Sequence, residues 1–202
     1  MKEVGRMADV AVSNVKLALE AFFTKSQKAI DEVYRKEEII NYLNQEITHF
    51  LTMCNGLGLP QSDYQLISGL YHVVNDIERI GDHAENLVEY AEYSMGNRLV
   101  YSDIAKEELT RMEEKVMKML NTTVGALKER NRDLAWKVIG LEDEVDNLKD
   151  ELRASHIDRL NTQRCTAASG VIFLDIVTNL ERIADHAYNI AQSVLNGGKH
   201  IG

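Results

Sequence analysis

"NDIERIGDHAENL", residues 75–87, and "TNLERIADHAYNI", residues 178–190, are two copies of one motif in a chain of 202 residues. Each copy contains Glu-Arg-Ile, a small residue, Asp-His-Ala, one variable residue and Asn, so that Glu78 returns as Glu181. A second correspondence lies upstream, where "EEIINYLNQEI" (37–47) parallels "EDEVDNLKDEL" (142–152). It pairs Glu37 with Glu142 and Asn41 with Asp146 at nearly the same offset. The repeated unit therefore spans about half of the chain and holds more than one helix.

The composition predicts an all-α protein, because only one proline occurs among many Leu, Ile, Val, Ala, Glu and Lys residues. Gly and Pro mark the clearest breaks, at 56–60 and 95–103, where Pro60 suits a first helical turn and Ser102 an N-cap. Together with weaker breaks near 24–28, 129–133 and 156–162, they predict helices at 3–24, 28–56, 60–95, 102–129, 132–157 and 162–196. The segment "NGGKHIG" closes the chain.

The third and sixth predicted helices each carry an apolar stripe with the 3.6-residue period. The stripes consist of Val73, Ile77, Ile80, Ala84, Leu87, Val88 and Ala91, and of Ile176, Leu180, Ile183, Ala187, Ile190 and Val194. Helices this amphipathic must bury their stripes against neighbours, and short loops favour antiparallel packing. We therefore predict two tandem antiparallel three-helix bundles, residues 1–97 and 98–202, related by a pseudo-two-fold.

Charge and residue content exclude several function classes. The formal net charge of −9 argues against a nucleic-acid surface, which needs basic patches, and leaves room for cations or a basic partner. Cys54 and Cys165 form neither a metal spacing nor a disulfide framework, which fits a reducing compartment. The charged N-terminus is unlike a signal peptide, and no apolar run approaches a membrane span. The expected location is the cytoplasm.

The acidic positions of the motif form a stripe of their own. Glu78 and Asp82 are four residues apart, which places them within roughly 40° of each other on a helix surface. Like charges at this spacing destabilise a helix by about a few tenths of a kcal/mol, yet Glu181 and Asp185 repeat the placement. Glu142 and Asp146 take a similar angle on the fifth predicted helix. Neighbouring helices thus bring carboxylates to one place, which suits Mg, Mn or Fe. The alternative is a solvated acidic face, which any single pair would fit.

The other polar positions of the motif point away from the acids. His83 and His186 follow the aspartates directly and lie about 100° around the helix. This angle favours capping, packing or hydrogen bonding to metal ligands over direct ligation. We expect Arg79 and Arg182 to pair with the excess acids. The expected supporting residues around a metal are His83, His186, Arg79, Arg182, Asn86 and Asn189.

The sequence resembles the PhoU family over nearly its whole length, and "ERIGDHAEN" and "ERIADHAYN" look like that family's Glu/Asp-x-x-x-Asp signature. The resemblance implies two three-helix bundles whose signature acids bind metal ions on the bundle surface; the expected ions are Mg, Mn, Fe or Zn. The acids that match are Glu78 and Asp82, Glu181 and Asp185 on the third helices, and Glu142 and Asp146 on a second helix. In the first bundle Glu37 is present but Asn41 replaces the acid. We therefore expect the first site to bind cations more weakly than the second.

The resemblance also implies a function in phosphate homeostasis, in which PhoU-like proteins restrain phosphate uptake and signalling. A similar domain forms the cytosolic part of bacterial Na⁺/phosphate cotransporters, and the opening "MKEVGRMADVAVSNVKLALEAF" looks more like the lead-in of that fused form. We expect a metal-binding regulatory domain of such a transporter, at the cytoplasmic face of the inner membrane; the alternative is a free-standing PhoU-type regulator. The implied partners are a phosphate transporter or its membrane domain and a signalling kinase, and a homo-oligomer is allowed.

Two other function classes remain open. A di-metal enzyme of ferritin-like type needs two Glu-x-x-His pairs and two further Glu residues, but only Glu46 with His49 is present. No nucleophile elbow, P-loop or zinc-hydrolase motif occurs, so we expect no catalytic activity. The last class is a helical scaffold whose acids are only solvated.

Overall fold

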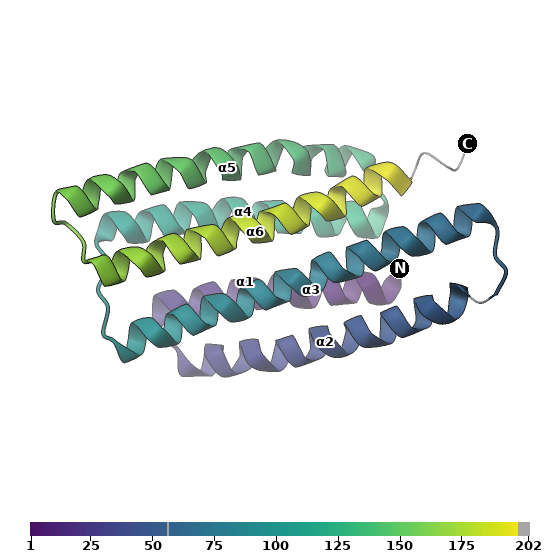
Figure 1. The fold of residues 1–202 in the computed structure, drawn as a ribbon, viewed down its shortest axis with the longest axis horizontal. Coiled ribbons are helices and arrows are strands. Elements are labelled where there is room, and N and C mark those ends of the chain that lie inside the picture. Colours follow the sequence, from purple (N-terminus) through teal and green to yellow (C-terminus); the bar gives the residue numbers. More distant parts are fainter. Residues whose placement is uncertain (56, 198–202) are drawn as a thin grey trace.

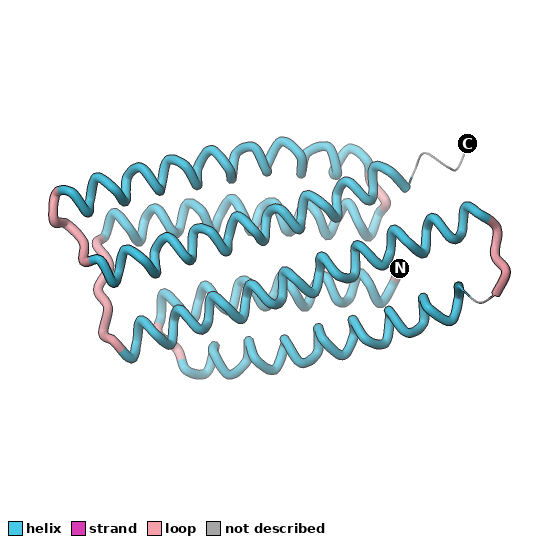
Figure 2. The backbone as a smooth tube through the Cα atoms, viewed as in Figure 1, coloured by secondary structure: helices cyan, strands magenta, loops and turns pink. Residues whose placement is uncertain are grey.

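The computed structural model describes residues 1–55 and 57–197, and these residues form six α-helices joined by short loops. The helices are α1 Lys2–Thr24, α2 Gln27–Asn55, α3 Gln61–Gly96, α4 Asp103–Glu129, α5 Arg132–Asn161 and α6 Ala167–Gly197. All run along the long axis of the molecule, with the loops at its two ends (Figure 2). None of the described helices is long and apolar enough to cross a membrane. The predicted end of the second helix, at residue 56, lies outside the described residues, and so do residues 198–202 of the closing segment.

The helices form two antiparallel three-helix bundles, α1–α3 and α4–α6, which confirms the predicted fold (Figure 1). The bundles meet mainly where α3 packs along α6, and α1 packs on α4 behind them. The predicted apolar stripes of α3 and α6 are buried in the core, except that Val194 is half-buried. Burying each large aliphatic side chain contributes about 1.5–3 kcal/mol, so these two stripes hold both the bundles and their interface together.

Local sequence sets the helix ends. Ser102 caps α4 by accepting a hydrogen bond from the Ala105 N–H, as predicted. Asn131 caps α5 in the same way. The prediction that α5 ends near 157 and α6 begins at 162 was wrong by four or five residues. The helix continues to Asn161, and Thr166 Oγ1 then accepts from the Ser169 N–H at the start of α6. A Thr that caps a helix is easily misread as part of it, because it carries no Gly or Pro signal.

A buried ion pair fixes the end of the second bundle. Arg159 on α5 bonds to Glu108 on α4 at 2.5 Å, and both side chains are buried. The guanidinium also lies 4.8 Å from the ring centre of Phe173 on α6, so it links all three helices. His156 stacks on the same ring from α5 and lies directly over Gly170, where a Cβ atom would clash with it.

Candidate functional site

Glu37 is the buried acid of the first bundle. It lies on α2 with 4% of its surface exposed, and its Oε2 accepts a hydrogen bond from Asn14 Nδ2 at 3.4 Å. Its Oε1 and the Asn14 Oδ1 are buried without any partner. The pKa of Glu37 is raised to about 7, first by burial and then by the carboxylates of Asp82, Glu85 and Glu78 on α3. Both unpaired atoms are acceptors, so either a proton or a cation would satisfy this place.

Gly81 explains how Glu37 reaches that position. A Cβ atom at residue 81 would lie 2.5 Å from Glu37 Oε2 and 3.0 Å from Ile40 Cδ1. The absence of a side chain therefore makes room for the carboxylate against the backbone of α3. The second motif has Ala184 at this point, and the corresponding Glu142 is only half-buried. The change from Gly81 to Ala184 between the two motif copies thus matches the deeper burial of Glu37 compared with Glu142.

The acids of α3 are partly neutralised within their own helix. Arg79 pairs with Asp82 at 3.1 Å and approaches Glu78 at 3.7 Å, as expected for this arginine. Burial, and then the charge of Asp82, raises the pKa of Glu78; burial followed by Glu89 raises that of Glu85. The exposed side of this stripe is a groove of about 340 Å³, lined by Arg79, Asp82, His83, Glu85, Asn86 and Glu89.

Lys149 lies among the acids of the second bundle, and the sequence analysis did not consider it. Its Nζ bonds to Asp146 Oδ1 on α5 at 3.0 Å and to Glu181 Oε1 on α6 at 2.8 Å. Only 18% of the Lys149 side chain is exposed, and the bond to Glu181 is the main reason that its pKa is raised. The spacing from Asp146, three residues along the same helix, could have shown that the lysine shares its face.

Glu142 and Asp185 complete the second cluster. Burial raises the pKa of both, and nearby carboxylates add to the shift; Lys149 acts in the opposite direction. The acids therefore lie close enough to repel one another, as the spacing predicted. Yet no three of the His, Cys, Asp and Glu side chains among the described residues are grouped as a metal ion would require. The expected order of the two sites, second tighter than first, compared only numbers of carboxylates and did not count this ammonium.

The motif histidines lie at the contact between the bundles. His83 Nδ1 bonds to Asn179 Oδ1 at 2.8 Å, and His186 Nδ1 bonds to Asp76 Oδ1 at 2.9 Å. Asp76 and Asn179 occupy equivalent positions, two helical turns before the histidine of their own motif, so the two bonds cross the pseudo-two-fold. The imidazole rings stack at 5.6 Å between them. Both imidazoles therefore pack between the two bundles, and their role around a metal ion stays a prediction.

The asparagines of the motif bond at the same contact, and Asn86 also lines the groove with the acids Asp82, Glu85 and Glu89. Asn86 and Asn189 donate to Asn179 and Asp76, at 3.3 and 3.4 Å. Burial lowers the pKa of His83, and the charges of His186 and Arg182 of the second bundle lower it further. Sequence reasoning missed Asp76 and Asn179, although both are polar and recur at the same offset as the two motifs.

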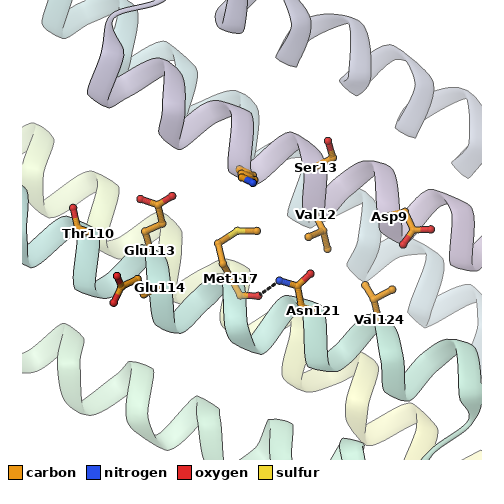
Figure 3. A pocket seen from close by; sticks show the side chains of 10 residues that line it. Asp9, Val12, Ser13, Thr110, Glu113, Glu114, Met117, Asn121 and Val124 are labelled. Carbon is orange, nitrogen blue, oxygen red and sulfur yellow. Dashed lines mark hydrogen bonds between the residues drawn. The ribbon is translucent and has the colours of Figure 1, made fainter.

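Two further places are poor candidates for chemistry. Glu46 and His49 are both exposed on α2, whereas a ferritin-like di-metal centre needs inward-facing ligands. A groove of about 660 Å³ lies between α1 and α4 (Figure 3). Its charged lining is Asp9, Lys16, Glu113 and Glu114. The excess of carboxylates makes it unsuited to an anion such as phosphate.

Comparisons with known proteins agree with this arrangement. The PhoU domain family matches residues 4–91 and 109–194. A "Phosphate-specific transport system accessory protein PhoU homolog" of Clostridium acetobutylicum is 26% identical over 96% of this chain and 88% of its own length. A protein of the same name from Synechocystis is 28% identical over 96% of this chain and 81% of its own. The crystal structure of PhoU from Pseudomonas aeruginosa superposes with a TM-score of 0.90 at 23% identity, covering 98% of this chain and 94% of that one.

Proposed function

The chain belongs to the PhoU family, and we propose on that premise that it regulates phosphate transport by contacts with other proteins. The observation that carries the proposal is the family match over both bundles, together with relatives that are named accessory proteins of a phosphate transport system. The regulator exerts its effect on a component of the transporter. It needs no catalytic activity, because the charged groups repeated in its two motifs lie on helix faces without a nucleophile among them.

The free-standing PhoU-type regulator is the better supported of the two forms considered. The relatives are accessory proteins by name, and this chain covers 88% and 81% of two of them. None of the comparisons reported above names a cotransporter, which was our first expectation. We therefore propose the role of an accessory regulator of a phosphate transport system.

Deleting the gene in its own host tests this function. Phosphate uptake at high external phosphate should rise and return to normal when the wild-type chain is supplied from a plasmid. Complementation by a variant with the exposed control change Lys137→Met should be complete. Uptake that does not change on deletion would count against the regulatory function, whatever the protein binds.

We further propose that the first bundle binds a divalent cation. The unpaired, buried Glu37 Oε1 is the observation that favours it. Glu78 and Asp82 on the facing helix are the further donors. Because no three such side chains among the described residues are grouped as a metal ion requires, the ion would have to draw these two acids toward Glu37. Carboxylate oxygens suit Mg²⁺ or Mn²⁺, and a bound ion would supply positive charge that holds α2 to α3. Because ligation needs an ionised Glu37 and its pKa is about 7, binding should weaken below neutral pH.

The second bundle fits a metal ion poorly as long as Lys149 remains in place. Its ammonium already bonds to one oxygen each of Asp146 and Glu181, two of the four predicted ligands. A divalent ion would have to displace it and meet its repulsion. We therefore propose that Lys149 acts as a built-in cation, and that the first site binds metal more tightly than the second.

Titration calorimetry with Mn²⁺ on protein stripped by chelator tests both proposals. Wild type should bind one ion, Asp82→Asn should lose it, and Asp185→Asn should leave it unchanged. Lys149→Met should gain a second ion, and the added change Asp185→Asn should remove that ion again. Lys137→Met, an exposed lysine on the same helix, serves as the matched control. Equal binding by wild type and Lys149→Met would refute the role of Lys149. No binding by any variant would leave the acids as a solvated face.

A further inference from the structure

The outer side of α2 carries a second apolar stripe that nothing in the described structure covers. Ile39, Tyr42, Phe50 and Met53 are between 42% and 61% exposed. With Glu46, also exposed, they follow the spacing 39, 42, 46, 50, 53, which puts all five on one side of the helix. This outer stripe is about 21 Å long, at 1.5 Å per residue. Figure 1 shows α2 at the edge of the molecule away from α5, with α3 nearer the second bundle.

The second bundle has no such stripe. The repeat aligns Glu37 with Glu142, so the equivalents of the four apolar residues on α5 are Glu144, Asn147, Ser155 and Asp158. Glu144 pairs with Lys115 of α4, and Glu151, the equivalent of Glu46, pairs with Arg111. The same helix face is therefore polar and ion-paired in one bundle and apolar in the other. Folding does not require the apolar version, because the repeat with the polar face forms the same bundle.

The charge around the outer stripe has one sign. Residues 37–78 contain no Lys and no Arg, although the chain has 23 of these residues in total. Within the stripe Glu46 is the single charged residue, and the exposed Glu38 lies beside its first member. A partner for this surface must bury apolar side chains and bring positive charge to the middle of the contact.

An exposed apolar stripe can bind a second copy of the chain, a membrane or a different protein, and the first two fit this surface badly. The stripe is symmetric about residue 46, so two copies packed antiparallel across a two-fold would place Glu46 against its own copy. A membrane surface with anionic lipids attracts Lys and Arg, and residues 37–78 have neither.

We propose that the outer stripe of α2 binds one amphipathic helix of a partner protein, with apolar side chains along one face and a basic residue opposite Glu46. The helix lies along α2 in the way that amphipathic helices occupy apolar grooves, with anchors at i, i+3/i+4 and i+7. Phe50 and Tyr42 are the main anchors, since aromatic side chains dominate such contacts. This surface is separate from the acids around Glu37, so its binding and the proposed metal binding are measured independently.

Two synthetic peptides of roughly 16 residues serve as probes, each held helical by a side-chain crosslink, with four leucines on one face and Gln and Ala elsewhere. They differ only in the central residue, which is Lys in one and Glu in the other. Because each peptide carries only this one charged side chain, its general attraction to or repulsion from the acidic protein is small. Fluorescence anisotropy at physiological salt reports their affinities. Wild type should prefer the Lys peptide by about tenfold. Glu46→Lys should reverse that preference.

Phe50→Ser with Tyr42→Ser should weaken the Lys peptide at least about tenfold, because both anchors are lost. The matched control is Trp136→Ser with Ile157→Ser, which removes two exposed apolar residues from α5 and should change nothing. All four positions are exposed, so the variants should fold, and circular dichroism checks this. Equal affinity for both peptides in wild type would overturn the proposal. The proposal would also be overturned if wild type formed a dimer in sedimentation, or bound phosphatidylglycerol vesicles, and the double change Phe50→Ser with Tyr42→Ser abolished that dimer or that binding.

Discussion

Replacing Glu37 by Gln should remove most of the pH dependence of stability that this one buried acid contributes. The pKa of Glu37 is raised from 4.5 to about 7 in the folded protein. The folded state therefore keeps the proton more tightly than the unfolded chain does. This contribution to stability is complete below pH 4.5 and is lost as the pH rises through 7.

The size of the effect follows from the two pKa values. At 1.36 kcal/mol per pH unit, the difference between 4.5 and about 7 corresponds to about 3 kcal/mol of unfolding free energy. Other acids with raised pKa values, such as Glu78, Glu142 and Asp185, act in the same direction. Only the difference between wild type and variant isolates Glu37.

Urea unfolding at pH 4.5, 6 and 8, in chelator so that no cation takes part, measures this difference. Wild type should lose about 3 kcal/mol more than Glu37→Gln between the lowest and highest pH, and the variant should be the more stable protein at pH 8. Glu38→Gln changes the exposed neighbour and should follow wild type. Parallel curves for wild type and Glu37→Gln would refute the reasoning that burial and the facing acids raise the pKa of this carboxyl.

Three other perturbations test the packing. Gly81→Ala should destabilise the protein by about 1–3 kcal/mol, because the new Cβ would lie 2.5 Å from Glu37 Oε2. Gly140→Ala has open space around it and should stabilise the protein by about 0.5–1 kcal/mol in the same urea assay. Stability changes of equal sign in the two variants would contradict the close approach of Glu37 to Gly81. Arg159→Met should lower the stability by about 3–5 kcal/mol in thermal unfolding, because it leaves Glu108 buried without its cation. Adding Glu108→Leu should recover part of that loss. If Arg159→Met alone were as stable as wild type, the pair would not be buried. Asp76→Ala should lower the unfolding free energy by about 1–3 kcal/mol, because it removes the acceptor of His186. Amide hydrogen exchange should then rise more along α3 and α6 than along α2 and α5. A uniform rise in exchange would argue against a role of Asp76 at the contact between the bundles.

The regular spacing of apolar residues was enough to predict the fold. Stripes such as Ile77, Ile80 and Ala84 have one period over many turns, and a helix that carries such a stripe must bury it. The repeat of Glu78 at Glu181 then required two equivalent bundles. Prediction failed at the end of α5, where no Gly or Pro marks the boundary and Thr166 begins the next helix through one side-chain hydrogen bond.

The candidate site was only partly readable in this way. Spacing along one helix placed Glu142 near Asp146 and Glu181 near Asp185, because neighbours on a helix face are fixed by 3.6 residues per turn. Contacts between helices depend on register and crossing, which no single helix encodes. Only the tertiary structure therefore showed that Lys149 reaches Glu181, that Gly81 admits the buried Glu37, and that His186 bonds to Asp76 of the other bundle. The sequence by itself determined which residues face inward, and the packing of six helices decided which charges meet.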